Sequence, residues 1–427
     1  MTDKSLKEII SEDEFLKIAE EPVRDILRLC NYLKQKGVQG INKKIYGYIV
    51  TESKILEDFL DDYGTIYNKT WYYFRELIAS IYTFGYSGYI LEHTQRRYEL
   101  DGDEWFAHFK YETIKYKAFF NDVLVALFKS IETEAKKNGL AFPDHKLNLR
   151  DFIEVPSNIV LPHNRNGEVV FDEKKEIIKI STMLSNIFKQ FGDLGCYKRY
   201  RLEEIKELIP TKISEEKIRK FELKTHNLQS VYDTYIRDSK SEIKDKNLDK
   251  LRNYISISFH LFEIAGSIIH FFERHEKIIS DFKDVIKEST LLYTAVNWAL
   301  YYAHISLARG DELAKTILSK YKEMDTITIG IPKNLGFHLR PATLVAKIVN
   351  FYGSEVYMMV GDDKFNASSV LEITWAGGKI SRENIREVTF IGDKRVLKDL
   401  KILAEVNYGE DIMGKSIELP KELSYLK

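Results

Sequence analysis

The chain contains few of the residues that cross-link or interrupt a fold. Its 427 residues include only two cysteines, Cys30 and Cys196, which are too widely separated for a C-x-x-C motif. One pair cannot supply a disulfide framework for a chain of this length, so we expect a reducing environment such as the cytoplasm. Only eight prolines occur, and their scarcity favours long, uninterrupted helices.

Charge of one sign and long hydrophobic runs are also missing. The formal net charge is -1, which provides no overall basic field for binding nucleic acid. The first residues, MTDKSLKEII, lack the apolar segment of a signal peptide. No later run of about 18 uncharged apolar residues, the length that suggests a membrane span, is present. We therefore expect a cytoplasmic protein with no nucleic-acid partner and no membrane insertion.

Signatures of several common enzyme classes are absent as well. The sequence has no glycine-rich phosphate loop, no H-E-x-x-H motif and no nucleophile elbow. We expect no cofactor and no bound metal. The function must therefore be inferred from other residues.

Helical periodicity dominates residues 1–322, where aliphatic and aromatic residues recur every three or four positions between charges. The segment 11–37 has Ser11 or Asp13 as a candidate N-cap and ends at Gly37. A chain of 427 residues exceeds the usual size of one core, so at least two domains are expected. The helical domain can be read as two halves, 1–139 and 173–322, joined by a linker with a small hairpin at 140–172.

The pattern changes from helical to alternating in residues 325–427. TITIGI alternates isoleucine with polar or small residues, as in a half-buried strand. The segments that follow predict the order β-α-β-β-α-β-α. This order gives an antiparallel sheet with helices on one face, an α+β open-faced sandwich. The predicted fold class is thus a multidomain protein with a large all-α N-terminal domain and a C-terminal α+β domain.

The sequence GFHLRPAT, residues 336–343, concentrates several features of an anion site. Gly336 lets the chain turn sharply, and His338 occupies the predicted N-cap position. Pro341 falls in the first helical turn, where a backbone N–H would have no hydrogen-bond partner within the helix. The free amides of that turn attract anions and favour a neutral, nucleophilic imidazole. Arg340 adds a fork of donors suited to a phosphoryl group.

These residues resemble the phosphorylation loop of HPr, the histidine-containing phosphocarrier protein of the phosphoenolpyruvate-dependent sugar phosphotransferase system. The resemblance covers about residues 325–415 and includes both the motif G-x-H-x-R-P-A and the predicted order of elements. It implies that His338 accepts a phosphoryl group from an enzyme I type donor and that Arg340 is its electrostatic partner. The implied phosphate-binding loop comprises Gly336, Leu339 and Pro341.

The resemblance also implies a docking surface and a regulatory site. Lys347, Val370 and Leu371 match positions used for partner docking. Ser369 aligns with a serine that a kinase modifies in some relatives, although it can also be a simple N-cap. The chain departs from the family at Glu372, where glycine is usual, and at Thr374, where a large apolar residue is usual.

Two functional hypotheses follow, and neither describes a turnover enzyme. The first is a phosphocarrier or regulatory protein in which the helical domain is the effector or binds a partner; the acceptor is unknown. The second is a scaffold or regulator that uses the HPr-like fold only for docking.

A third, weaker idea is a metal site in the helical domain, although buried hydrogen-bonded side chains explain the same pattern. The residues concerned are His260, Glu263, His270 and Glu273.

Overall fold

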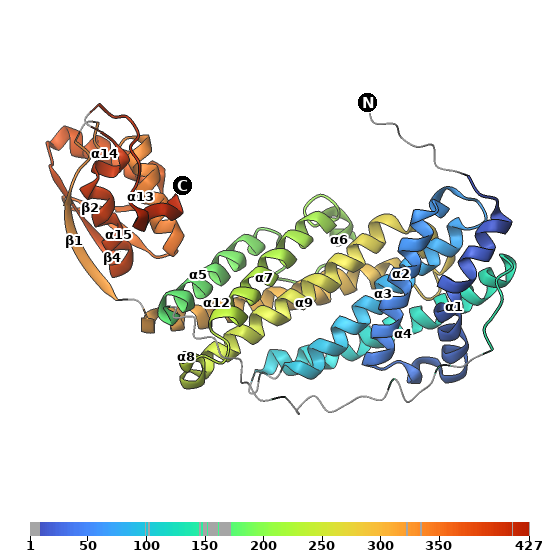
Figure 1. Ribbon diagram of the computed structural model, residues 1–427. Coiled ribbons are helices and arrows are strands. Elements are labelled where there is room, and N and C mark those ends of the chain that lie inside the picture. Colours follow the sequence, from blue (N-terminus) through green and yellow to red (C-terminus); the bar gives the residue numbers. More distant parts are fainter. Residues whose placement is uncertain are drawn as a thin grey trace. The chain divides into compact units, whose positions relative to one another are not determined.

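The computed structural model describes residues 9–98, 100, 103–144, 147, 152, 161, 172–321, 323–333, 335–411 and 413–426. The protein is mostly helical and carries a four-stranded antiparallel sheet near its C-terminus (Figure 1). It divides into two compact units, one of residues 1–169, 189–227 and 253–308 and one of residues 170–188, 228–252 and 309–427. The predicted hairpin at 140–172 lies almost wholly outside the described residues, and the boundary at 322 stays a prediction.

The first helices begin and end where local chemistry specifies. Ser11 caps α1 in a capping box, because its hydroxyl accepts from the Glu14 amide while the Glu14 carboxylate accepts from the Ser11 amide. At the other end Gly37 has φ 57°, a conformation that glycine adopts readily. The sequence-based limits of this helix are confirmed. The helices of this half are α1 (Glu12–Lys36), α2 (Lys43–Asp62), α3 (Tyr72–Arg97) and α4 (Glu104–Lys137), with short 3-10 turns η1 (Gly37–Gly40) and η2 (Thr65–Tyr67).

Helical structure resumes at Glu173, as the periodicity predicts. The helices are α5 (Glu173–Gly192), α6 (Leu202–Leu208), α7 (Glu215–Tyr235), α8 (Lys240–Lys244), α9 (Lys246–Arg274), α10 (Glu276–Asp281), α11 (Glu288–Leu292), the π-helical η4 (Tyr293–Leu300) and α12 (Tyr301–Tyr321). Among the described residues, α9 alone is long and apolar enough to cross a membrane, and 83% of its most apolar window is buried inside the protein. Such burial is what a core helix requires.

The C-terminal region, residues 323–426, contains the whole four-stranded sheet. Its elements follow the order β1 (Met324–Gly330), α13 (Leu339–Tyr352), β2 (Val356–Val360), β3 (Asp363–Asn366), α14 (Val370–Glu383), β4 (Glu387–Asp393) and α15 (Lys394–Glu405), with the short turns η5 (Asn407–Gly409) and η6 (Lys421–Leu426). The strands lie in the order β1-β4-β2-β3, and all neighbours are antiparallel. Ile327 faces Phe390 across the β1/β4 pair.

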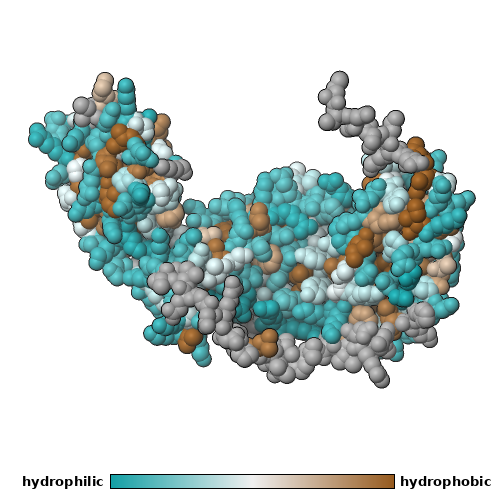
Figure 2. All heavy atoms as spheres, in the orientation of Figure 1, coloured by the Kyte–Doolittle hydropathy of each residue, from teal (hydrophilic) through white to brown (hydrophobic). Residues whose placement is uncertain are grey.

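One face of this sheet is covered by helices. α14 contacts β2 and β3, α15 contacts β1 and β4, and α13 packs against both of these helices. Alternate residues of β2, Val356, Met358 and Val360, are buried in the resulting core, as the two-residue period of a strand requires. The surface seen in Figure 2 is mostly hydrophilic, with hydrophobic areas on the C-terminal region and on the helical part.

Candidate functional site

His338 lies where the loop after β1 enters α13, as the sequence predicts. Gly336 has φ 61°, so the chain turns in the left-handed region just before the histidine. His338 is the N-cap of α13 in an extended conformation, and its side chain makes no capping hydrogen bond. Pro341 is buried in the first turn of α13, where the absence of an N–H costs no hydrogen bond. The imidazole nitrogens are therefore not used to cap the helix.

A buried carboxylate faces the imidazole. Nε2 of His338 lies 3.0 Å from Oε2 of Glu410, whose side chain is only 1% exposed, whereas the His338 side chain is 31% exposed. No hydrogen bond from the described residues reaches Nδ1 of His338. Because a carboxylate can only accept, this contact favours the ring with its proton on Nε2 and a lone pair on Nδ1.

A turn that follows α15 positions Glu410. Gly409 has φ 78°, and a Cβ atom there would lie 2.9 Å from Leu344 of α13. The preceding residue, Tyr408, donates its hydroxyl to the Gly330 carbonyl at 2.7 Å and packs its ring on Phe337. Burial raises the pKa of the Tyr408 phenol, so this donor keeps its proton at physiological pH. These contacts anchor the turn beside the loop that carries His338.

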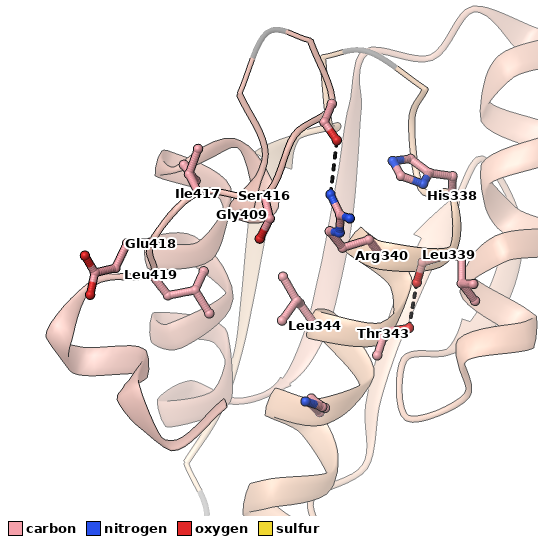
Figure 3. A pocket seen from close by; sticks show the side chains of 12 residues that line it. His338, Leu339, Arg340, Thr343, Leu344, Gly409, Ser416, Ile417, Glu418 and Leu419 are labelled. Atoms are coloured by element: carbon pink, nitrogen blue, oxygen red, sulfur yellow. Dashed lines mark hydrogen bonds between the residues drawn. The ribbon is translucent and has the colours of Figure 1, made fainter. Parts of the chain in front are cut away.

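Arg340 is the third residue of this site, beside His338 and Glu410. Its Nη1 donates to the Gly414 carbonyl at 3.0 Å (Figure 3). The same Nη1 lies 3.5 Å from Oε1 of Glu410. Oε1 of Glu410 is buried and has no hydrogen-bond partner within the described part of the chain. The Arg340 side chain is 47% exposed, so an anion can approach it. The His338 imidazole and the Arg340 guanidinium therefore contact the same buried carboxylate at the N-terminus of α13.

Sequence reasoning located His338 and Arg340 but missed Glu410. The structure brings Glu410 from 72 positions away in the chain, and no local pattern marks it. Of the predicted loop residues, Gly336 provides the turn and Pro341 is buried, whereas Leu339 is 70% exposed.

The predicted docking residues lie on two helices. Lys347 is exposed on α13, and its Nζ donates to the Leu426 carbonyl at 3.1 Å. On α14, Val370 is half-buried and Leu371 is 59% exposed. Trp375, one turn beyond Leu371 and 61% exposed, was missed by the sequence reasoning and extends this surface.

Ser369 is the N-cap of α14. Its hydroxyl accepts from the Glu372 amide at 3.2 Å, and the Glu372 carboxylate accepts from the Asn366 amide at 2.7 Å. The N-cap reading of this serine is therefore confirmed, and its modification stays a prediction. Glu372, which departs from the family pattern, belongs to this capping arrangement.

A pocket of about 710 Å³ opens beside His338 and Arg340 (Figure 3). One wall is a face of α13, and the other consists of lining residues from the C-terminal segment 409–419, namely Gly409, Gly414 and residues 416–419. Residues seven apart on a helix share a face about 10 Å apart along its axis, so Arg340 and Lys347 mark two ends of the first wall. The lining residues are His338, Leu339, Arg340, Thr343, Leu344, Lys347, Gly409, Gly414, Ser416, Ile417, Glu418 and Leu419.

The two histidines of the four residues considered for a metal site, His260 and His270, are paired with carboxylates. His260 and Glu263 are buried and 2.6 Å apart, and His270 reaches Glu215 at 2.8 Å. Burial is confirmed for His260 and Glu263. It is wrong for His270, which is half-buried, and for Glu273, which is exposed near the end of α9. Within the described residues, no group of three or more His, Cys, Asp or Glu side chains is arranged to hold a metal ion.

Comparison of the chain with protein families, with curated proteins and with solved structures finds no match.

Proposed function

We propose that this protein is an HPr-like phosphocarrier or regulator that accepts a phosphoryl group on His338. The observation that supports this proposal most directly is the arrangement around one imidazole: Nε2 faces buried Glu410, Nδ1 is left without a partner among the described residues, and Arg340 lies alongside. The antiparallel sheet with helices on one face agrees with the fold that the motif implies.

Each group has a chemical role in the proposed transfer. The lone pair on Nδ1 of His338 attacks phosphorus, and the bond from phosphorus to the donor breaks, returning its electron pair to the donor. The ring gains positive charge as the new P–N bond forms, and the Nε2 proton remains hydrogen-bonded to Glu410, which stabilises that charge. Arg340 binds the phosphoryl oxygens with the donors that face solvent. Glu410 acts through the imidazole and is a positioning residue.

The donor in this proposal is an enzyme I type protein charged by phosphoenolpyruvate. Incubating the full-length protein with enzyme I and radiolabelled phosphoenolpyruvate should give an acid-labile label, and His338→Ala should lose it. His108→Ala is a matched control, because His108 is 66% exposed on α4, and this variant should keep the label. A wild-type protein that stays unlabelled under conditions that charge an ordinary HPr contradicts the proposal.

The exposed side chains on α14 favour a second candidate, a docking protein that transfers no phosphoryl group. Leu371 and Trp375 present adjacent apolar surface to solvent, a common feature of interaction sites. On this reading, purified enzyme I or another phosphotransferase component binds wild type and His338→Ala equally. Loss of that binding in Trp375→Ala, together with an unlabelled His338, selects the docking function.

A further inference from the structure

The pocket between α13 and the C-terminal segment 409–419 has the properties of a small-molecule site. Its volume of about 710 Å³ lies within the range of about 300 to 1,000 Å³ typical of such sites. We propose that it binds a small organic phosphate ester with an apolar body, with the phosphate at Arg340 and the body between the two walls. Binding of such an ester in this pocket does not require phosphoryl transfer to His338.

The floor and walls of the pocket supply apolar contact. Leu344 comes from α13, and Ile417 and Leu419 come from the segment opposite (Figure 3). Leu344 and Leu419 pack against the hydrophobic core of the C-terminal region, so their exposed faces are held in place by packing. An apolar ligand body that covers them removes this surface from water, which is the main favourable term in binding.

The charges of the lining favour an anionic group. Arg340 uses Nη1 for the Gly414 carbonyl, and its remaining donors have no partner among the residues that the structure describes. Lys347 donates one hydrogen bond to Leu426, and an ammonium group has three donors. Two lining cations thus keep unused hydrogen-bonding capacity, which a phosphate can satisfy.

Two carboxylates near the pocket do not cancel this preference. Glu410 lies 3.5 Å from Nη1 of Arg340, but its side chain is only 1% exposed and it is not a lining residue of the pocket. Glu418 is a lining residue at the rim, and Figure 3 shows its carboxylate directed away from Arg340 and Leu344. The accessible charge at the His338 end of the pocket is therefore the Arg340 guanidinium.

A ligand bound here has a consequence for the proposed function. Its phosphate would occupy the Arg340 donors that the transfer to His338 needs, so ligand and phosphoryl donor would compete. This consequence rests on the proposed function, whereas ligand binding does not. If the protein binds the ligand but is never labelled, only the proposed phosphoryl transfer is refuted. If it is labelled but binds no ligand, only the proposed ligand binding in the pocket is refuted.

The test uses 1-naphthyl phosphate as the probe and ligand-observed NMR with the full-length protein. At about 0.3 kcal/mol per non-hydrogen atom, a ligand of this size should bind with a Kd of about 0.1 to 1 mM. Arg340→Ala should raise the Kd at least about tenfold, because it removes charge-assisted hydrogen bonds, and Lys347→Ala should raise it as well. The matched controls Arg382→Ala on α14 and Lys401→Ala on α15, both outside the pocket lining, should leave it unchanged.

Two further probes separate the contributions of charge and apolar body. Neutral 1-naphthol and inorganic phosphate should each bind at least about tenfold more weakly than 1-naphthyl phosphate, because each lacks one half of the recognised chemistry. Equal binding of 1-naphthol overturns the role of the cations, and equal binding of inorganic phosphate overturns the role of the apolar walls. Absence of saturable binding of 1-naphthyl phosphate below 5 mM, about five times the weakest expected Kd, overturns the whole proposal.

Discussion

The protein contains the same side-chain pair in two different settings. In the helical part, Nδ1 of His260 contacts Glu263 at 2.6 Å and Nε2 contacts the Tyr98 hydroxyl at 3.0 Å, so both ring nitrogens are occupied. In the C-terminal region, His338 contacts Glu410 through Nε2, and no hydrogen bond from the described chain reaches Nδ1. The side chain of His260 is 9% exposed and that of His338 is 31% exposed.

This difference separates a pair whose imidazole uses both ring nitrogens from one whose imidazole uses a single nitrogen, as the proposed transfer requires. A buried imidazole whose two nitrogens are both hydrogen-bonded satisfies its own polar groups and those of its neighbours. An imidazole with one nitrogen held by a carboxylate and no hydrogen bond on the other can act as a nucleophile, which is the role proposed for His338. The His–Glu pair alone therefore does not distinguish the two settings, whereas the occupancy of the second ring nitrogen does.

Glu263→Ala should have the largest effect and should act on stability. The Glu263 carboxylate accepts from both buried His260 and half-buried Tyr86, so its removal leaves two polar groups without their partner. We expect the free energy of unfolding to fall by about 3 to 5 kcal/mol, measured by urea titration with circular dichroism, while labelling of His338 per folded molecule is unchanged. Glu273 on the same helix is exposed, so Glu273→Ala should lower the free energy of unfolding by less than about 0.5 kcal/mol. Equal effects of the two variants would contradict the structural role of Glu263.

Glu410→Gln should act on chemistry instead. The amide keeps the shape of the side chain but loses the charge that holds the Nε2 proton, so the labelling rate of His338 should fall about 10- to 100-fold. Nitrogen NMR of the imidazole should show a smaller fraction of the tautomer with the proton on Nε2. The rim variant Glu418→Gln should label at the wild-type rate. An unchanged tautomer ratio in Glu410→Gln refutes the positioning role even if the rate falls.

Gly377→Ala tests how closely α14 must approach the loop before His338. A Cβ atom at Gly377 would lie 2.7 Å from the Phe337 carbonyl oxygen, whereas one at Gly378 would meet nothing within 4 Å. The added methyl group must displace the loop or the helix, and we expect a loss of about 1 to 3 kcal/mol in the free energy of unfolding together with slower labelling. Gly378→Ala should be neutral or slightly stabilising, because alanine favours helix. Similar unfolding curves for the two variants would argue against this contact.

The smallest expected effect concerns Asp393, which caps α15. Burial of this side chain favours its neutral form and acts to raise its pKa. Hydrogen bonds from Arg395 and Ser354 outweigh burial, so the pKa of the Asp393 carboxyl lies below its ordinary value.

A folded-state pKa below the unfolded value means that the unfolded chain binds more protons as pH falls, so stability rises with pH in this window. The contribution of Asp393 is complete above the unfolded pKa of about 3.9 and is lost as pH falls through the lower folded value. Asp393→Asn should therefore cost about 1 kcal/mol at pH 7 and progressively less below pH 4. Unfolding measured at several pH values would show a constant difference if Asp393 carried no such linkage.

The order of elements in the C-terminal region was predictable because each segment carries its own local signal. Ser369 caps α14, and Gly353, with φ 55°, ends α13 at the residue where the helical pattern stops. Alternation in TITIGI predicted β1. Glu410 and the pocket had no such signal, because they arise when a turn after α15 passes over a helix that lies some 60 residues earlier in the chain.

Local sequence signals were sufficient to predict the helices and strands of the C-terminal region and to place His338 and Arg340 together at the start of a helix. These properties depend on neighbours within a few positions, where periodicity, caps and glycines act. The contact of the imidazole with Glu410 through one nitrogen, and the pocket beside it, became visible only in the folded chain. Such contacts join distant parts of the chain, and they form only when the hydrophobic core brings those parts together.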